Sequence, residues 1–202
     1  MTRKARRSRT ICSAALPRSR GGNFQNFCRN GVPPEFAGNV VLDAGSTRLM
    51  VAALGLMSRG GRRSSPRRAS IIRLPAGAVT FDRPLHVLLT SRACAYKLRA
   101  QDLRDWLVRI RPATPLLRSF NPTMTGAVYS QDELDDLGEV LVAADMLAIE
   151  DALFAGSEHD PDKTGGRLAA SPAGERCLTV AGASKLHCLA NLRIGWGAAR
   201  NG

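Results

Sequence analysis

The chain has few aromatic side chains and no long apolar run. Phe, Trp and Tyr together make up 5% of its 202 residues, against a hydrophobic fraction of 44%. Any core must therefore be built mainly from Ala, Val and Leu side chains. Because no apolar run reaches about 18 residues, we predict that the chain has no membrane span.

Recognisable catalytic motifs are also lacking. The sequence contains no Walker loop, GxGxxG turn, HExxH helix or nucleophile elbow, so motifs give no support for an enzyme. Its five cysteines are an odd number without a Cys-x-x-Cys pair, which is typical of free thiols in a reducing compartment. We therefore predict a cytoplasmic protein, lean against an enzyme, and assign no catalytic residue, no metal and no cofactor.

Arginine is what the chain has in excess. The formal net charge is +12, and only four of the 29 basic residues are lysine, a skew that a GC-rich gene would also produce. The first 119 residues carry 23 Lys and Arg against five acids, whereas the remaining 83 carry six against twelve. This asymmetry predicts a basic half that meets polyanions.

Two arginine-rich clusters are candidate contacts with nucleic acid. One stands near the N-terminus, and the other lies in a stretch over 58–70 whose composition predicts a flexible loop. Guanidinium groups match the geometry of phosphate, so these side chains suit the nucleic-acid backbone. The predicted contact residues are Arg3, Lys4, Arg6, Arg7, Arg62, Arg63, Arg67 and Arg68.

The clearest local prediction is an amphipathic helix over 131–154. Ser130 and Glu133 have the spacing of a capping box, the arrangement that begins many helices. Apolar residues then recur at helical intervals up to Phe154, just before Gly156, which gives about six turns. The pattern also suits an apolar helix face that binds a partner protein.

Other segments are less decisive. A helix is predicted over 96–110, ending before a proline, and a Pro-rich linker over 112–129. Residues 39–56 fit either two strands about a turn or a strand followed by a helix. The apolar segment 176–196 fits a strand or a helix equally well.

Within residues 39–56, a short loop contains a glycine followed by two hydroxyl side chains. The segment Leu42-Asp43-Ala44-Gly45-Ser46-Thr47 resembles the first phosphate loop of the sugar kinase and actin superfamily. Gly45 would let the backbone approach a phosphate, and the resemblance implies a nucleotide-binding hairpin. It covers only six residues, and the sequence favours a plain hairpin turn.

Together these segments predict a small, single α+β domain over 38–196, with a short sheet and two or three helices. A basic, disordered arm over 1–37 would precede it. For function, we predict a non-catalytic accessory or regulatory protein that contacts nucleic acid through its Arg-rich N-terminal half. Two alternatives stay open: a protein-protein interaction module that uses the 131–154 helix, and a reading frame without a defined activity.

Overall fold

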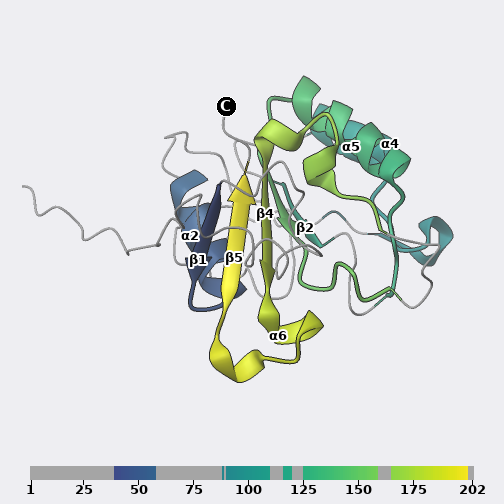
Figure 1. The fold of residues 1–202 in the computed structure, drawn as a ribbon. Coiled ribbons are helices and arrows are strands. Elements are labelled where there is room, and N and C mark those ends of the chain that lie inside the picture. Colours follow the sequence, from purple (N-terminus) through teal and green to yellow (C-terminus); the bar gives the residue numbers. More distant parts are fainter. Residues whose placement is uncertain are drawn as a thin grey trace, which may run out of the picture.

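The described part of the chain forms one five-stranded sheet. The computed structural model describes residues 39–57, 88, 90–109, 116–119, 125–158 and 165–199. The sheet order is β1-β5-β4-β3-β2, where β2, β3 and β4 are parallel and β5 runs antiparallel between β4 and β1 (Figure 1). The strands are β1 (Val40–Asp43), β2 (Leu116–Ser119), β3 (Ala148–Asp151), β4 (Cys177–Gly182) and β5 (Gly195–Ala199). Four strands therefore point the same way, and their carboxyl ends meet at one edge.

Helices cover both faces of this sheet (Figure 1). The helix α2 (Ser46–Met57) packs against one face, where it meets buried Ile149 and Val180. On the other face lies α5 (Gln131–Ala143), with α4 (Ala100–Arg109) packed against it. Side chains fully buried on this second side are Leu103, Leu134, Leu137, Leu141 and Leu168. A mainly parallel sheet with both faces covered is a doubly wound α/β arrangement.

The predicted α+β class is therefore wrong, and the predicted 131–154 helix is wrong beyond its first half. The helix α5 ends at Ala143, Asp145 takes a φ of 52°, and the strand β3 follows at Ala148–Asp151. Because β3 is buried on both faces, its apolar residues do not alternate with polar ones. Such a run cannot be told from a continued helix by its period.

Several local predictions are confirmed. At the start of α5, the Ser130 hydroxyl accepts the Glu133 N–H at 3.2 Å, and the Glu133 carboxylate accepts the Ser130 N–H at 2.8 Å. The helix predicted over 96–110 is α4, which ends at Arg109 before the proline as expected but begins only at Ala100, so its predicted start was four residues too early. Residues 39–56 form a strand followed by a helix, so that alternative was right and the hairpin turn wrong.

The linker predicted over 112–129 is wrong where it contains β2, which pairs in parallel with β3. The segment 176–196 holds neither a single strand nor a single helix. It contains β4, the short helix α6 (Ala183–Leu186) and the start of β5. The predicted arm over 1–37 and the loop over 58–70 lie outside the described residues and stay predictions, as does the 38–196 domain boundary.

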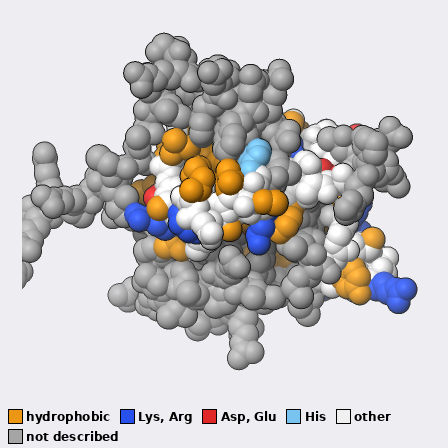
Figure 2. Space-filling model, turned by 60° about the horizontal axis from the view of Figure 1, so that its bottom comes forward, with side chains coloured by type: hydrophobic (Ala, Val, Ile, Leu, Met, Phe, Trp, Pro, Cys, Tyr) orange, Lys and Arg blue, Asp and Glu red, His pale blue; other side chains and the backbone are white. Residues whose placement is uncertain are grey.

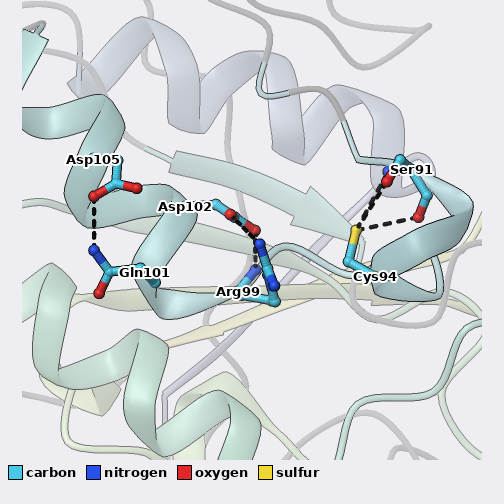
Figure 3. A network of polar contacts seen from close by, with 6 residues as sticks. All are labelled: Ser91, Cys94, Arg99, Gln101, Asp102 and Asp105. Carbon is cyan, nitrogen blue, oxygen red and sulfur yellow. Dashed lines mark hydrogen bonds and ion pairs between the residues drawn. The ribbon is translucent and has the colours of Figure 1, made fainter.

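Exposed polar contacts fix the start of α4 (Figure 3). Arg99 pairs with Asp102 at 2.7 Å, and the Gln101 amide donates to Asp105 at 2.7 Å. Just before the helix, the Cys94 thiol donates to the Ser91 carbonyl at 3.1 Å. An ion pair as exposed as that of Arg99 and Asp102 contributes little to stability.

A buried carboxyl group on β3 gives the fold a pH-dependent element. Glu150 is 1% exposed and accepts hydrogen bonds from the Leu168 N–H at 2.9 Å and the Thr179 hydroxyl at 2.7 Å. Burial raises its pKa, although both hydrogen bonds favour the charged form. The folded chain therefore holds this proton more tightly than the unfolded chain, and stability falls as pH rises above the ordinary glutamate range.

We expect Glu150→Gln to remove this pH dependence, because glutamine keeps the shape of the side chain but cannot ionise. The unfolding free energy of the variant minus that of the wild type should increase from about pH 4.5 upward. Denaturant titrations across this range measure the difference. A difference that stays constant with pH would show that Glu150 ionises in the folded chain as it does in the unfolded one.

Candidate functional site

Groups that can bind or react gather where the four like-directed strands end. Ligand sites of open α/β sheets lie beyond the carboxyl ends of the strands. Here β1 leads into Gly45, β3 ends at Asp151, β4 leads into Lys185, and Arg193 precedes β5 at the same edge. Figure 2, in which the bottom of Figure 1 comes forward, shows Lys and Arg side chains beside a group of hydrophobic ones.

An anion cradle forms at the turn between β1 and α2. Gly45 has a φ of 91°, which favours glycine, and a Cβ at this position would overlap Nη2 of Arg193. The guanidinium therefore lies directly over the Gly45 backbone. Beside it, α2 begins at Ser46 and presents the positive end of its dipole. Gly45, Ser46, Thr47 and Arg193, here called the anion cradle, have the features of a phosphate site.

The acidic residue that precedes the cradle in sequence is already paired. Asp43, the last residue of β1, accepts the Ala44 N–H at 2.7 Å and forms an ion pair with Nε of Arg48 at 3.3 Å. Its side chain is 15% exposed, whereas that of Arg48 is 51% exposed. Since Arg48 offsets this negative charge, Asp43 does not prevent the cradle from binding an anion.

Lys185 stands in α6, directly after β4. The start of α6 is fixed because the Ala183 N–H donates to the Ile194 carbonyl at 3.1 Å. The exposed Lys185 ammonium lies 5.7 Å from the centroid of the Phe154 ring. Lysine, unlike arginine, can lose its proton and act as a nucleophile, so Lys185 is a candidate for covalent chemistry.

Asp151 ends β3, the strand parallel to β4 and hydrogen-bonded to it. Its Oδ1 atom accepts the Leu153 N–H at 3.1 Å, which fixes the carboxylate at the strand end. An amine, a carboxylate and an anion cradle thus share one edge of the sheet. Together they could hold a phosphorylated cofactor that carries a carbonyl carbon and a basic ring nitrogen.

Asp151, Lys185 and Arg193 were not among the site residues predicted from the sequence, whereas Gly45, Ser46 and Thr47 appeared there only through the resemblance to a phosphate loop. One signal could have found Lys185: lysine is rare in this chain, so a lysine just after an apolar segment is unexpected. All eight predicted nucleic-acid contacts, from Arg3 to Arg68, lie outside the described residues. Their contact with nucleic acid, and a protein contact through the 131–154 segment, stay untested predictions.

Comparisons with known proteins identify the family of the chain. The model of the family "Aminotransferase class I and II" matches residues 99–201, just over half of the chain. Putative aminotransferase YugH of Bacillus subtilis is 30% identical over 117 residues, which are 57% of this chain and 29% of that protein. The match thus spans less than a third of that curated relative.

Solved structures show the same fold at low sequence identity. An aminotransferase from Escherichia coli has a TM-score of 0.70 and 20% identity, over 96% of this chain and 48% of that one. The PLP-bound C-S lyase from Staphylococcus hominis has a TM-score of 0.70 and 16% identity, over 95% and 51%. An aromatic aminotransferase from Pyrococcus horikoshii has a TM-score of 0.67 and 18% identity, over 87% and 47%. The chain spans about half the length of these structures.

These matches correct the function predicted from the sequence. A non-catalytic accessory protein that contacts nucleic acid was the wrong prediction, because the matched family is that of the class I and II aminotransferases and the curated relative is a putative aminotransferase. The two alternative functions, a protein-protein interaction module that uses the 131–154 helix and a reading frame without a defined activity, are not supported either. A small independent domain is also wrong, since the fold is part of a larger one. The chain belongs to the class I and II aminotransferase family.

Proposed function

We propose that this chain forms the cofactor-binding part of a pyridoxal phosphate (PLP) enzyme that transfers the amino groups of amino acids. The observation that carries the proposal is the meeting of Lys185, Asp151 and the anion cradle at one edge of the sheet. The name of the curated relative, a putative aminotransferase, and the PLP-bound state of a similar lyase support it.

The residues at this edge fit PLP group by group. The Lys185 amine is the kind of group that bonds covalently to an aldehyde carbon. The Asp151 carboxylate suits the ring nitrogen, because PLP sites place an acidic or basic side chain at that atom. The anion cradle suits the phosphate, and a side chain at position 45 would fill the space that Arg193 occupies.

Each residue has a distinct chemical task in this proposal. Bound PLP would supply an electron sink for negative charge that develops on the α-carbon of an amino acid. Asp151 would hold a proton on the ring nitrogen through a charge-assisted hydrogen bond. The Nζ atom of Lys185 would take up and return protons as a general base and acid. Arg193 and the first turn of α2 would bind and orient the phosphate.

Covalent trapping tests the proposal directly. The purified chain is incubated with PLP, reduced with borohydride, digested and mapped by mass spectrometry. We expect the label on the peptide that contains Lys185, and slower labelling in the presence of inorganic phosphate, which competes for the cradle. Because the chain has only four lysines, the assignment is unambiguous. No label, or a label distributed evenly over the lysines, would refute the proposal.

We expect Asp151→Asn to separate cofactor capture from chemistry. The variant should still take the label at Lys185, because it leaves the amine and the cradle in place. It should slow the exchange of the α-proton of alanine in deuterated water by about tenfold to a hundredfold, as expected for losing a hydrogen bond to a charged group. Proton NMR follows this exchange.

The matched control for this prediction is Asp145→Asn. Asp145 is an aspartate near the other end of β3: it pairs with Arg176 at 2.6 Å and stands before the strand, at the opposite edge of the sheet. Its replacement should leave the exchange rate unchanged. Equal rates for Asp151→Asn and the wild type would remove Asp151 from the proposed site.

A cytoplasmic location belongs to the same proposal. Cys94, Cys177 and Cys188 are free thiols, as expected in a reducing compartment. Among the helices of the described ranges, none has the length and apolar character needed to cross a bilayer.

A further inference from the structure

Two guanidinium groups flank the turn between β1 and α2. The guanidinium of Arg193 lies over the Gly45 backbone, where a Cβ on Gly45 would overlap its Nη2 atom. The guanidinium of Arg48 comes from the first turn of α2, and its Nε atom lies 3.3 Å from Oδ1 of Asp43. The same oxygen accepts the Ala44 N–H at 2.7 Å. Arg48 is therefore held beside the residue that directly precedes Gly45.

Stability does not account for an arginine at position 48. Because the Arg48 side chain is 51% exposed, its ion pair with Asp43 contributes little to the free energy of unfolding. A cation in the first turn of a helix also opposes the helix dipole. The first turn of α2 contains no acid, whereas the first turns of α4 and α5 do, which is the favoured arrangement. The start of α2 thus keeps a positive potential.

The charge at this turn balances that of a phosphate group only when Arg48 is included. The helix start contributes about half an elementary charge, to which Arg193 adds one. With Arg48 added and Asp43 subtracted, the turn has a net charge of about +1.5. A phosphate monoester carries about −1.5 to −2 at neutral pH. Without Arg48, a charge of only about +0.5 would face the phosphate.

The Asp43 carboxylate engages only part of the Arg48 side chain. A guanidinium presents five N–H donors in a planar fork, and the contact with Asp43 is made through Nε. One carboxylate cannot accept from all five donors, so Arg48 can bind a second oxyanion without leaving Asp43.

We propose that Arg48 is a phosphate-binding residue that completes the anion cradle together with Arg193. This inference rests on the proposed function and deepens it, because it adds a cation to the site for the cofactor phosphate. The Arg48 guanidinium would bridge the phosphate and the Asp43 carboxylate. Arg48 then both offsets the carboxylate and binds the anion that the carboxylate would otherwise repel.

Inorganic phosphate tests the inference without any cofactor. Titrations of the chain at constant ionic strength, followed by phosphorus NMR, give the dissociation constant. We expect Arg48→Gln to weaken phosphate binding about five- to tenfold. Arg99→Gln is the matched control, because Arg99 also pairs with an acid, Asp102, at 2.7 Å, but at the start of α4 on the other face of the sheet. It removes the same charge and should change phosphate binding by less than about twofold.

An Asp43→Asn background distinguishes direct binding by Arg48 from neutralisation of Asp43. If Arg48 acted only by offsetting the carboxylate, its loss would have no effect once the carboxylate is gone. We expect Arg48→Gln to weaken phosphate binding about five- to tenfold in this background as well. A change of less than about twofold in either background would overturn the inference.

Pyridoxal, which lacks the phosphate, provides the second comparison. We expect Arg48→Gln to slow the borohydride-trapped labelling of Lys185 by limiting PLP about five- to tenfold and to leave labelling by pyridoxal unchanged. Equal slowing with both compounds would overturn the inference, because it would place the effect of Arg48 on the fold or on Lys185. If phosphate binds through Arg48 but no variant is labelled at Lys185, the proposed function fails and the inference stands. If Lys185 is labelled but the wild type binds no phosphate, the inference fails.

Discussion

We expect Lys185→Ala to abolish covalent capture of PLP and to lower α-proton exchange on the order of 10²- to 10⁴-fold. The variant removes the amine that the aldehyde needs, together with the group that moves the proton. Because Lys185 is exposed, the change should leave the unfolding free energy nearly unchanged. Borohydride trapping, proton NMR and a denaturant titration measure the three quantities.

Lys185→Arg is the more informative companion variant. Arginine keeps the positive charge and the length of the side chain but stays protonated, so it neither attacks an aldehyde nor carries protons. We expect this variant to be as inactive as the alanine variant. Lys97→Arg, which keeps the charge that pairs with Glu133 at 2.7 Å, should behave as the wild type. Substantial exchange by Lys185→Arg would show that charge, and not amine chemistry, is what position 185 supplies.

The difference between lysine and arginine also explains why the arginine excess gave a wrong prediction of function. Arginines suggested a phosphate-binding partner, but most of them lie outside the described residues. Within the described part, Arg193 is placed over Gly45 by the fold. Chemistry that needs a deprotonated amine excludes arginine, so the few lysines carried more information about function than the many arginines.

Local signals predicted local structure well. The cap formed by Ser130 and Glu133 and the end of α4 at Arg109 depend on side chains close in sequence, and both are confirmed. The strand β3 was missed because both of its faces are buried, which removes the alternation that marks a strand. Because β3 was not predicted, the parallel sheet was not predicted either. The edge of the sheet at which β3 ends with Asp151 was missed for the same reason.

The site could not be assembled from the sequence for a related reason. Asp151, Lys185 and the Gly45 turn are far apart in the chain and meet only because β1, β3 and β4 point the same way. The glycine and hydroxyls after β1 did signal a phosphate loop. They did not specify the fold that carries it, because phosphate sites at helix starts occur in many folds. The resemblance to sugar kinases and actin was therefore wrong.

Two glycines in β5 give the other large prediction. A Cβ on Gly195 would overlap the Ser46 nitrogen and the Gly45 carbonyl carbon, which are backbone atoms that no side-chain rotation can move. A Cβ on Gly197 would meet nothing closer than Cδ1 of Leu178, at 3.6 Å. We expect Gly195→Ala to lower the unfolding free energy by about 3 kcal/mol. Gly197→Ala should change it by less than about 1 kcal/mol in either direction.

The two variants also distinguish an effect on the stability of β5 from an effect on phosphate binding at the anion cradle. To accept a methyl group at position 195, the turn at Gly45 and Ser46 must move away from β5, and Arg193 then loses its place over that turn. Gly195→Ala should therefore weaken inhibition of PLP labelling by inorganic phosphate, whereas Gly197→Ala should not. Urea titrations and competition assays measure both effects. Equal losses in the two variants would mean that β5 tolerates no side chain anywhere, and that the close approach at Gly195 does not build the cradle.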